Sequence, residues 1–254
     1  MIHTVLTIAG SDPSGGAGIQ ADLRTCAKLN VHGMAVIVAL TAQNSTTVSG
    51  IFNVPDHVIA LQLDAVLPEI EHDSVVKTGM LGTAAIVRLV ADKLKAHRID
   101  RLVIDPVMTS TSGRRLLERD ATEVLKSSLM PLCTLITPNL VEAEELTGVP
   151  VNDIPGMEHA ARRLHELGAR NVLLKGGHLS GGDAVDVLFD GEDLVRLRAP
   201  RIATTGVRGT GCILSSAIAA YMAKGALLAD AVRLGKEFVT QVIAGPELGD
   251  RGSR

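Results

Sequence analysis

The stretch Val5–Leu40, VLTIAGSDPSGGAGIQADLRTCAKLNVHGMAVIVAL, contains the unit from which the fold can be derived. Its first part, Val5–Ala9, is a short apolar run that predicts a β-strand, and a glycine-rich turn follows at 10–16. A second apolar run, Ala35–Leu40, predicts another strand. Between the two, apolar residues recur at helical spacing, at Ile19, Leu23, Cys26 and Leu29. This order predicts a βαβ unit, which places both strands in a parallel sheet.

The same alternation continues to the end of the chain. Short apolar runs predict strands at 75–78, 102–104, 133–137 and 172–174, and a β-hairpin at 184–189 and 194–197. Helical periodicity and capping residues predict helices that begin near 56, after Thr83 and at 140, a helix through 160–167 that ends at Gly168, and two more from about 211 and 228. Repeated βα units predict an α/β protein with helices on both faces of a parallel sheet.

Composition limits the kind of protein that this chain can form. Of its 254 residues, 46% are hydrophobic but only 2% are aromatic, so the core must consist mainly of aliphatic side chains. Because no linker, repeat or low-complexity tract interrupts the pattern, we expect one domain over 1–254. The net charge of −3 and the lack of a long basic run give no support for binding to nucleic acid or to an anionic membrane.

The cysteines and the N-terminus predict a soluble protein of a reducing, cytoplasmic compartment. Cys26, Cys133 and Cys212 have neither disulfide nor zinc-ligand spacing. The sequence MIHTVLT at the start lacks the features of a secretory signal, and no apolar run is long enough to span a membrane. Cys26 and Cys133 fall at apolar positions of the pattern, so we expect both in the core.

Polar and glycine-rich segments follow most of the predicted strands. In open α/β sheets, ligands bind beyond the carboxyl ends of the strands, so these segments should converge on one site. They are 10–18, 41–44, 79–80, 105–108, 138–142, 175–178 and 209–212.

The last of these segments, Gly209–Cys212, has the sequence GTGC and opens a predicted helix. A helix N-terminus presents unpaired N–H groups and a partial positive charge, which suit a phosphate or a developing oxyanion. A thiol at that place should have a lowered pKa and some thiolate character near neutral pH. Gly209, Thr210, Gly211 and Cys212 are therefore candidates for an anion hole with an adjacent base.

Two nucleotide-binding motifs need separate consideration. Gly16–Ala21 matches a relaxed GxGxxG/A pattern, but no acidic residue follows the second strand until Asp56, which disfavours a dinucleotide site. A tight strand-to-helix turn, or a close approach of the backbone to a small substrate, are the alternatives, and we prefer the latter. Gly235-Lys236 lacks the upstream glycine of a Walker A loop, so phosphoryl transfer would not use that motif.

Three charged residues lie near predicted strand ends. Asp105 and Glu142 offer carboxylate oxygens, which Mg²⁺ prefers, and a few carboxylates suffice when nucleotide phosphates complete the site. Lys175 precedes two glycines, where it could neutralise a nucleotide phosphate or be an ordinary solvated lysine.

Taken together, these segments closely resemble the hydroxymethylpyrimidine/phosphomethylpyrimidine kinases of thiamine biosynthesis, within the ribokinase-like superfamily. The resemblance extends from about residue 3 to about residue 248. Its motifs are LTIAGSDPSGGAGIQAD (6–22), TAQN (41–44), KTGML (77–81), DPVM (105–108), ITPNL (136–140), KGGH (175–178) and GTGC (209–212).

The resemblance implies a three-layer α/β/α sandwich with a mostly parallel central sheet, which is usually a homodimer. It implies phosphorylation of 4-amino-5-hydroxymethyl-2-methylpyrimidine, and then of its monophosphate, with ATP and Mg²⁺. Gln43 would hydrogen-bond the aminopyrimidine, because an amide both donates and accepts. Ala17, Asp22, Met80 and Val107 would line the same pocket.

The remaining roles follow from the same resemblance. Cys212 would act as general base on the hydroxymethyl oxygen, within the anion hole of 209–212. Asp105 and Glu142 would organise Mg²⁺ and its water. The residues near the nucleotide phosphates would be Asn139, Lys175, Thr204 and Arg208.

Some positions depart from the family pattern. Thr111 stands where the family usually has lysine, Gly206-Val207-Arg208 replaces Asn-Thr-His, and Ile213 replaces threonine. The sequence ends at 249–254, where the family continues with a His/Gly/Pro-rich tail. Arg208 or Arg114 could supply the missing positive charge near the phosphates.

Three alternatives remain beside the pyrimidine kinase. One is a pyridoxal kinase on the same scaffold, and another is a pyrimidine-binding homologue that has lost catalysis. A dehydrogenase, suggested by the glycine pattern at 16–21 alone, is the third.

Overall fold

The computed structural model describes residues 2–177, 179, 182–202 and 208–245. Its strands are β1 (Thr4–Ser11), β2 (His32–Gln43), β3 (Val48–Asn53), β4 (Val75–Thr78), β5 (Leu102–Ile104), β6 (Leu135–Ile136), β7 (Val172–Leu174), β8 (Asp183–Phe189) and β9 (Leu194–Pro200). Its α-helices are α1 (Gly18–Lys28), α2 (Asp56–Val66), α3 (Ala84–Ala96), α4 (Arg119–Val124), α5 (Leu140–Thr147), α6 (Ile154–Glu166), α7 (Thr210–Ala223) and α8 (Leu228–Ala244).

These strands form a single nine-stranded sheet in the order β3-β2-β1-β4-β5-β6-β7-β8-β9. The six strands from β2 to β7 in that order pair in parallel. β3 is antiparallel to β2 at one edge, and the β8–β9 hairpin extends the other edge antiparallel to β7. The expected mostly parallel sheet is confirmed.

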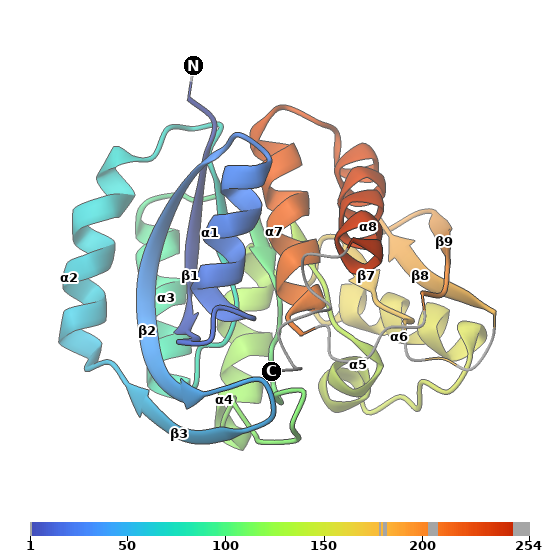
Figure 1. Ribbon diagram of the computed structural model, residues 1–254, viewed down its shortest axis with the longest axis horizontal. Coiled ribbons are helices and arrows are strands. Elements are labelled where there is room, and N and C mark those ends of the chain that lie inside the picture. Colours follow the sequence, from blue (N-terminus) through green and yellow to red (C-terminus); the bar gives the residue numbers. More distant parts are fainter. Residues whose placement is uncertain (1, 178, 180–181, 203–207, 246–254) are drawn as a thin grey trace.

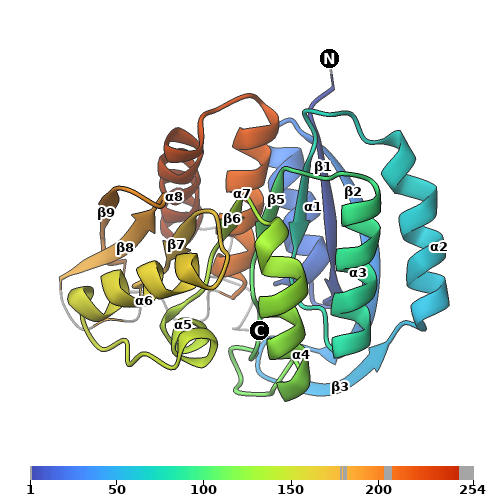
Figure 2. The ribbon, with the colours of Figure 1, turned by 180° about the vertical axis from the view of Figure 1, so that it is seen from behind.

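Helices cover both faces of the sheet. Figure 1 looks onto the face covered by α1, α7 and α8, and Figure 2 looks onto the opposite face, with α2, α3, α4 and α6. Each face has its own apolar core, because successive strand residues point to opposite sides. In β4, for example, Val75 packs into the core with α1 and α7, whereas Val76 packs into the core with α2 and α3.

Local sequence signals explain several element boundaries. Thr83 caps α3 by accepting a hydrogen bond from Ile86 N, and Gly168 has a φ of +112°, so it ends the α6 region in the left-handed conformation expected there. The predicted strands 75–78, 102–104 and 172–174 match β4, β5 and β7. In the described part of the chain, no helix is both long and apolar enough to cross a membrane.

Two elements have no counterpart in the predicted pattern. β3 is a six-residue edge strand interrupted by Gly50, so it shows no clear alternation of apolar and polar side chains. α4 has only six residues, lacks a side-chain cap and continues into a π-turn at Leu125–Leu129. Both are short segments stabilised by packing rather than by their own periodicity.

Candidate active site

A pocket of about 530 Å³ lies at the carboxyl ends of the parallel strands. It extends from the ends of β1 and β2 to the β8–β9 hairpin and α8. Its walls include residues from each of the predicted polar and glycine-rich segments. Among them are Gly10, Asp12, Ala17, Gln43, Met80, Asp105, Val107, Asn139, Glu142, Lys175, Arg208, Gly209, Thr210, Gly211 and Cys212.

A row of polar side chains crosses the sheet beneath this pocket, on the face that α7 covers. On that face, the apolar residues of the five central strands are Val5, Val75, Val103, Leu135 and Leu173. Because side chains alternate, the residue two positions further along each strand points to the same face. These five residues are Thr7, Lys77, Asp105, Thr137 and Lys175. In the strand register, Thr7 and Lys77 are level with Val103, and Lys175 is level with Asn139, so the polar residues advance stepwise across the sheet toward the start of α7.

The turn that begins α7 approaches other backbone closely. Gly209 is the N-cap, with a φ of +69°, and a Cβ there would overlap with the carbonyl oxygen of Gly16. No side chain caps the helix, so its first N–H groups remain available to a ligand. A Cβ on Gly211 would lie 3.1 Å from Lys175 Nζ, so glycine allows the lysine to lie against the helix start. The predicted anion-binding turn therefore borders the pocket, with a cation beside it.

Cys212 differs from the expectation in its proton affinity. Its side chain is partly exposed and borders the pocket, but removal from bulk water raises the pKa of the thiol to about 12. The positive charge of Lys77 acts against this rise, while the carboxylates of Asp105 and Asp22 add to it. The predicted thiolate near neutral pH is therefore wrong, because burial and two nearby carboxylates outweigh the helix N-terminus.

Asp105 and Lys175 form an ion pair on the pocket floor. Lys175 Nζ donates to Asp105 Oδ1 at 2.9 Å, and the two side chains are only 15% and 2% exposed. Burial alone would raise the pKa of Asp105, but the ammonium groups of Lys175 and Lys77 lower it below its ordinary value. Asp105 is therefore a carboxylate at neutral pH, and Lys175 is a half-buried cation next to the glycine turn.

Glu142 and Asn139 form a reciprocal capping box at the start of α5. Asn139 Oδ1 accepts from Glu142 N at 2.9 Å, and Glu142 Oε2 accepts from Asn139 N at 2.8 Å. Burial raises the pKa of Glu142 to about 7, although Lys175 acts in the opposite direction. Glu142 thus caps α5 and also borders the pocket.

At the other end of the pocket, Gln43 is oriented by a residue that the sequence did not single out. Gln43 Nε2 donates to Asp12 Oδ2 at 3.0 Å, and the same carboxylate oxygen accepts from Ala17 N at 2.9 Å. Asp12 is buried, and its other oxygen accepts from the Ser14 backbone and hydroxyl. Asp12 escaped notice because an aspartate in a Gly-Ser-Asp-Pro turn is typical of ordinary turns.

The glycine pattern at 16–21 has a structural cause. Gly18 has a φ of +58°, and a Cβ there would overlap with the carbonyl oxygen of Gly10. The turn thus packs against its own preceding strand, and Ala17 faces the pocket beside it. The tight strand-to-helix turn is therefore present, and because Ala17 and Gly18 both border the pocket, the preferred close approach of the backbone to a small substrate stays a prediction.

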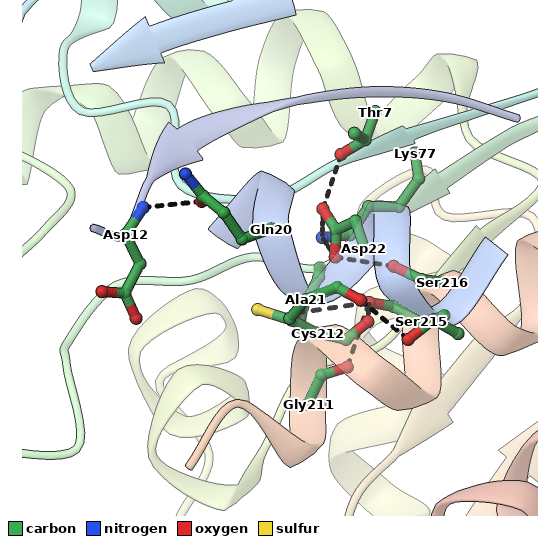
Figure 3. A network of polar contacts seen from close by, with 12 residues as sticks. Thr7, Asp12, Gln20, Ala21, Asp22, Lys77, Gly211, Cys212, Ser215 and Ser216 are labelled. Carbon is green, nitrogen blue, oxygen red and sulfur yellow. Dashed lines mark hydrogen bonds and ion pairs between the residues drawn. The ribbon is translucent and has the colours of Figure 1, made fainter. Parts of the chain in front are cut away.

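Asp22 lies below the pocket and is not among the residues of its wall. It is fully buried on α1, and Lys77 Nζ donates to both of its oxygens, at 3.0 and 2.9 Å. Thr7 and Ser216 each donate a further hydrogen bond to it at 2.6 Å, as Figure 3 shows. Lys77 was not assigned a role from sequence, although a lysine within the apolar strand VVKT was a visible signal.

The two arginines that could replace a missing cation contact a different part of the molecule. Arg208 donates to the carbonyl oxygen of Asn44, and Arg114 donates to those of Val48 and Ser49, at 3.0 and 3.2 Å. Both therefore hold the β2–β3 turn, at the Gln43 end of the pocket. Thr204 lies outside the described residues.

A third ion pair, which is also buried, lies at the far end of the pocket, and sequence reasoning missed it. Lys236 Nζ on α8 donates to Asp186 Oδ2 at 2.6 Å, and Asp186 Oδ1 accepts from Gly176 N at 2.9 Å. The pair connects α8 to the turn that follows Lys175. Gly235-Lys236, dismissed as a Walker motif, thus has a structural function.

Comparisons with known proteins agree with this geometry. Residues 12–252 match the family model described as phosphomethylpyrimidine kinase. The hydroxymethylpyrimidine/phosphomethylpyrimidine kinase of Streptomyces coelicolor is 47% identical over 96% of this chain and 90% of its own length. The thiamine biosynthesis bifunctional protein ThiED of Geobacter sulfurreducens is 52% identical over 94% of this chain and 49% of its own. The chain thus spans about half the length of the bifunctional relatives that it matches.

Solved structures show the same fold. A phosphomethylpyrimidine kinase of Clostridium difficile has a TM-score of 0.84 and 41% identity, with 96% of this chain and all of that chain covered. The ADP complex of a Bacillus subtilis pyridoxal kinase has a TM-score of 0.87 and 40% identity, with 94% and 91% covered. The fold is therefore ribokinase-like, as the sequence predicted. By sequence, fold and pocket, the chain belongs to the phosphomethylpyrimidine kinase family.

Proposed function

We propose that this protein transfers the γ-phosphoryl group of ATP to 4-amino-5-hydroxymethyl-2-methylpyrimidine, and then to its monophosphate. One observation supports this most directly. The uncapped start of α7, beside the half-buried cation Lys175, borders the same pocket as the amide of Gln43. Such a pocket can hold an anionic phosphoryl group at one place and a polar ring at another.

The acceptor ring would lie at the Gln43 end. Gln43 Nε2 donates to Asp12, and Gln43 Oε1 accepts only a long hydrogen bond from Thr41, at 3.5 Å. The carbonyl oxygen could therefore also accept a hydrogen bond from the exocyclic amino group of the pyrimidine. Ala17, Met80 and Val107 would contact the ring from the same walls. Asp22 is assigned no contact with the acceptor, because it is buried beneath the floor.

The phosphoryl group would lie against Gly209, Thr210, Gly211 and Cys212, with Lys175 and Asn139 near the nucleotide phosphates. Phosphoryl transfer passes through a loose transition state, so positioning and charge stabilisation matter more than a strong base. The amides and Lys175 would stabilise the transferred group, and the alcohol would lose its proton late. Because its pKa is raised, Cys212 is mostly a thiol at neutral pH, so it would accept that proton only in its minor thiolate form.

The residues of the floor fit a magnesium ion held with the nucleotide. Asp105 and Glu142 supply oxygen ligands, and the raised pKa of Glu142 is the expected property of a carboxyl group near a second negative charge in a buried site. Among the described residues there is no cluster of three metal ligands, so phosphate and water oxygens would complete the coordination. Bound Mg²⁺ would neutralise charge on the phosphates.

We also propose that the protein is a homodimer, as the resemblance implies. Leu40 and Phe52 are paired across β2 and β3 and are 48% and 64% exposed, so the β2–β3 arm offers an apolar surface for a second copy.

A coupled assay of ADP release tests the function with three acceptors: the pyrimidine alcohol, its monophosphate and pyridoxal. We expect turnover with the first two, and a kcat/KM for pyridoxal well below that for the alcohol. Pyridoxal is included because pyridoxal kinases of Bacillus subtilis and Staphylococcus aureus share this fold at 34–40% identity. A higher kcat/KM for pyridoxal would transfer the assignment to that substrate, and tight pyrimidine binding without ADP release would contradict kinase activity.

A further inference from the structure

Lys77 is a buried cation for which the proposed reaction has so far given no role. Its side chain has no exposed surface, and it lies in the middle of the sheet, on β4. Burial alone would lower the pKa of Lys77, but the carboxylate of Asp22, followed by the charges of Cys212 and Asp105, raises it well above its ordinary value. Lys77 is therefore a cation at neutral pH.

The charge of Lys77 is held in a fixed position by four elements of the fold. Its Nζ donates to both oxygens of Asp22 on α1, which also accept from Thr7 on β1 and Ser216 on α7. Figure 3 shows this network together with Cys212. A carboxylate that accepts four hydrogen bonds cannot change its rotamer without losing most of them, so the ammonium group cannot move either.

Lys77 also lies at the edge of the pocket. Lys77 and Gly79 both border the pocket, and a Cβ on Gly79 would lie 3.1 Å from Lys77 Nζ. Lys77 is paired with Val103, two residues before Asp105 on the neighbouring strand, and its charge lowers the pKa of Asp105. The positive charge of Lys77 is thus close enough to Asp105 and to Cys212, in the first turn of α7, to lower the pKa values of both.

We propose that Lys77 is a positioning residue that supplies a fixed positive charge beneath the transferred phosphoryl group, and that Asp22 holds it there. The inference rests on the proposed kinase function. Preorganised charges of this kind act most strongly where negative charge develops in the transition state, and they need no rearrangement during the reaction. Removal of the charge should therefore reduce kcat more than it weakens the binding of either substrate.

The test separates this electrostatic role from a purely structural one. Lys77→Met alone leaves the buried carboxylate of Asp22 without its ion-pair partner and should destabilise the fold. The double variant Lys77→Met/Asp22→Asn removes both charges together, so thermal stability should largely return. We expect the double variant to keep a kcat about 100-fold below that of the wild type, a typical loss for one electrostatic group, with both KM values within about threefold.

A matched control keeps both charges. Thr7→Val removes one hydrogen bond to Asp22 and nearly preserves the side-chain volume, and we expect its kcat to stay within about fivefold of the wild type. A double variant with kcat within about fivefold of the wild type would overturn the inference, and so would one whose acceptor KM rises tenfold or more. Absence of ADP release by the wild-type protein would contradict the proposed function instead.

Discussion

The hydroxyl of Ser216 donates a hydrogen bond to Asp22 Oδ1 at 2.6 Å, although the two residues are 194 positions apart in the chain. This bond joins α7, which begins with the glycine turn, to α1, which begins with the other glycine-rich turn of the pocket. The same carboxylate binds Lys77 on β4. The position of the anion-binding turn is therefore fixed by buried side chains as well as by its own backbone.

Replacement of Cys212 by alanine should reduce turnover by about 10² while it changes acceptor binding little, because a proton-accepting group acts mainly in the transition state. Steady-state kinetics and binding of the pyrimidine alcohol check this. Cys26→Ala is the control, since that thiol is buried on α1 and does not border the pocket. Unchanged turnover in Cys212→Ala would exclude Cys212 as the proton acceptor.

Gly209→Ala should reduce the free energy of unfolding much more than Gly225→Ala does. Both glycines have a left-handed φ, of +69° and +85°, so each substitution introduces a strain of about 1–2 kcal/mol. A Cβ on Gly225 meets nothing within 4 Å, whereas one on Gly209 would overlap with the carbonyl oxygen of Gly16.

We therefore expect a larger loss of unfolding free energy for Gly209→Ala, measured in urea, and a loss of ADP release that Gly225→Ala does not show. Equal stability and equal activity of the two variants would mean that the close approach of Gly209 to Gly16 has no importance.

Glu142 should make the protein less stable as the pH rises from about 4.5 to about 7. In this interval the unfolded chain has lost the proton, whereas the folded protein still holds it because burial raises the pKa of Glu142 to about 7. Glu142→Gln removes this dependence. The unfolding free energy of the variant relative to wild type should increase over the interval, on the order of 1–3 kcal/mol, and then become constant above pH 7.

Glu145→Gln on the same helix is the control of opposite sign. The hydrogen bond and charge of Arg115 lower the pKa of Glu145, so wild type should lose stability relative to that variant only as the pH falls below about 4.5. Urea unfolding at several pH values measures both. A flat profile for Glu142→Gln relative to wild type would show that Glu142 is ionised in the folded protein.

Arg208→Ala should weaken the binding of the acceptor and leave the binding of ATP nearly unchanged. Arg208 donates to the carbonyl oxygen of Asn44, the residue that follows Gln43, so its loss should loosen the β2–β3 turn. We expect the acceptor KM to rise about three- to tenfold, which corresponds to the loss of one hydrogen bond to a charged group, while the ATP KM stays within about twofold.

Arg114→Ala is the parallel variant, because Arg114 holds the same turn at Val48 and Ser49. A rise in the ATP KM with an unchanged acceptor KM would restore the idea that Arg208 replaces a missing cation near the phosphates.

The sequence by itself determined most of the strands and helices, all but β3 and α4, and the edge of the sheet where the pocket lies. These properties depend on local patterns: apolar runs such as Val75–Thr78, the cap at Thr83, and the glycines that permit turns at 10–18 and 209–212. Family motifs also pointed to Gln43, Asp105, Lys175 and Cys212, and all four border one pocket.

The tertiary structure alone decided which charges meet and what they do to one another. Asp22 is a partner of Lys77 rather than part of the pocket wall, because α1 places it over β4, which is far away in the sequence. The pKa of Cys212 is raised because burial and nearby carboxylates outweigh the helix N-terminus, which is the only influence that the sequence reveals. Proton affinity and charge pairing depend on distances through space and on exclusion of water, and a linear pattern of residues specifies neither.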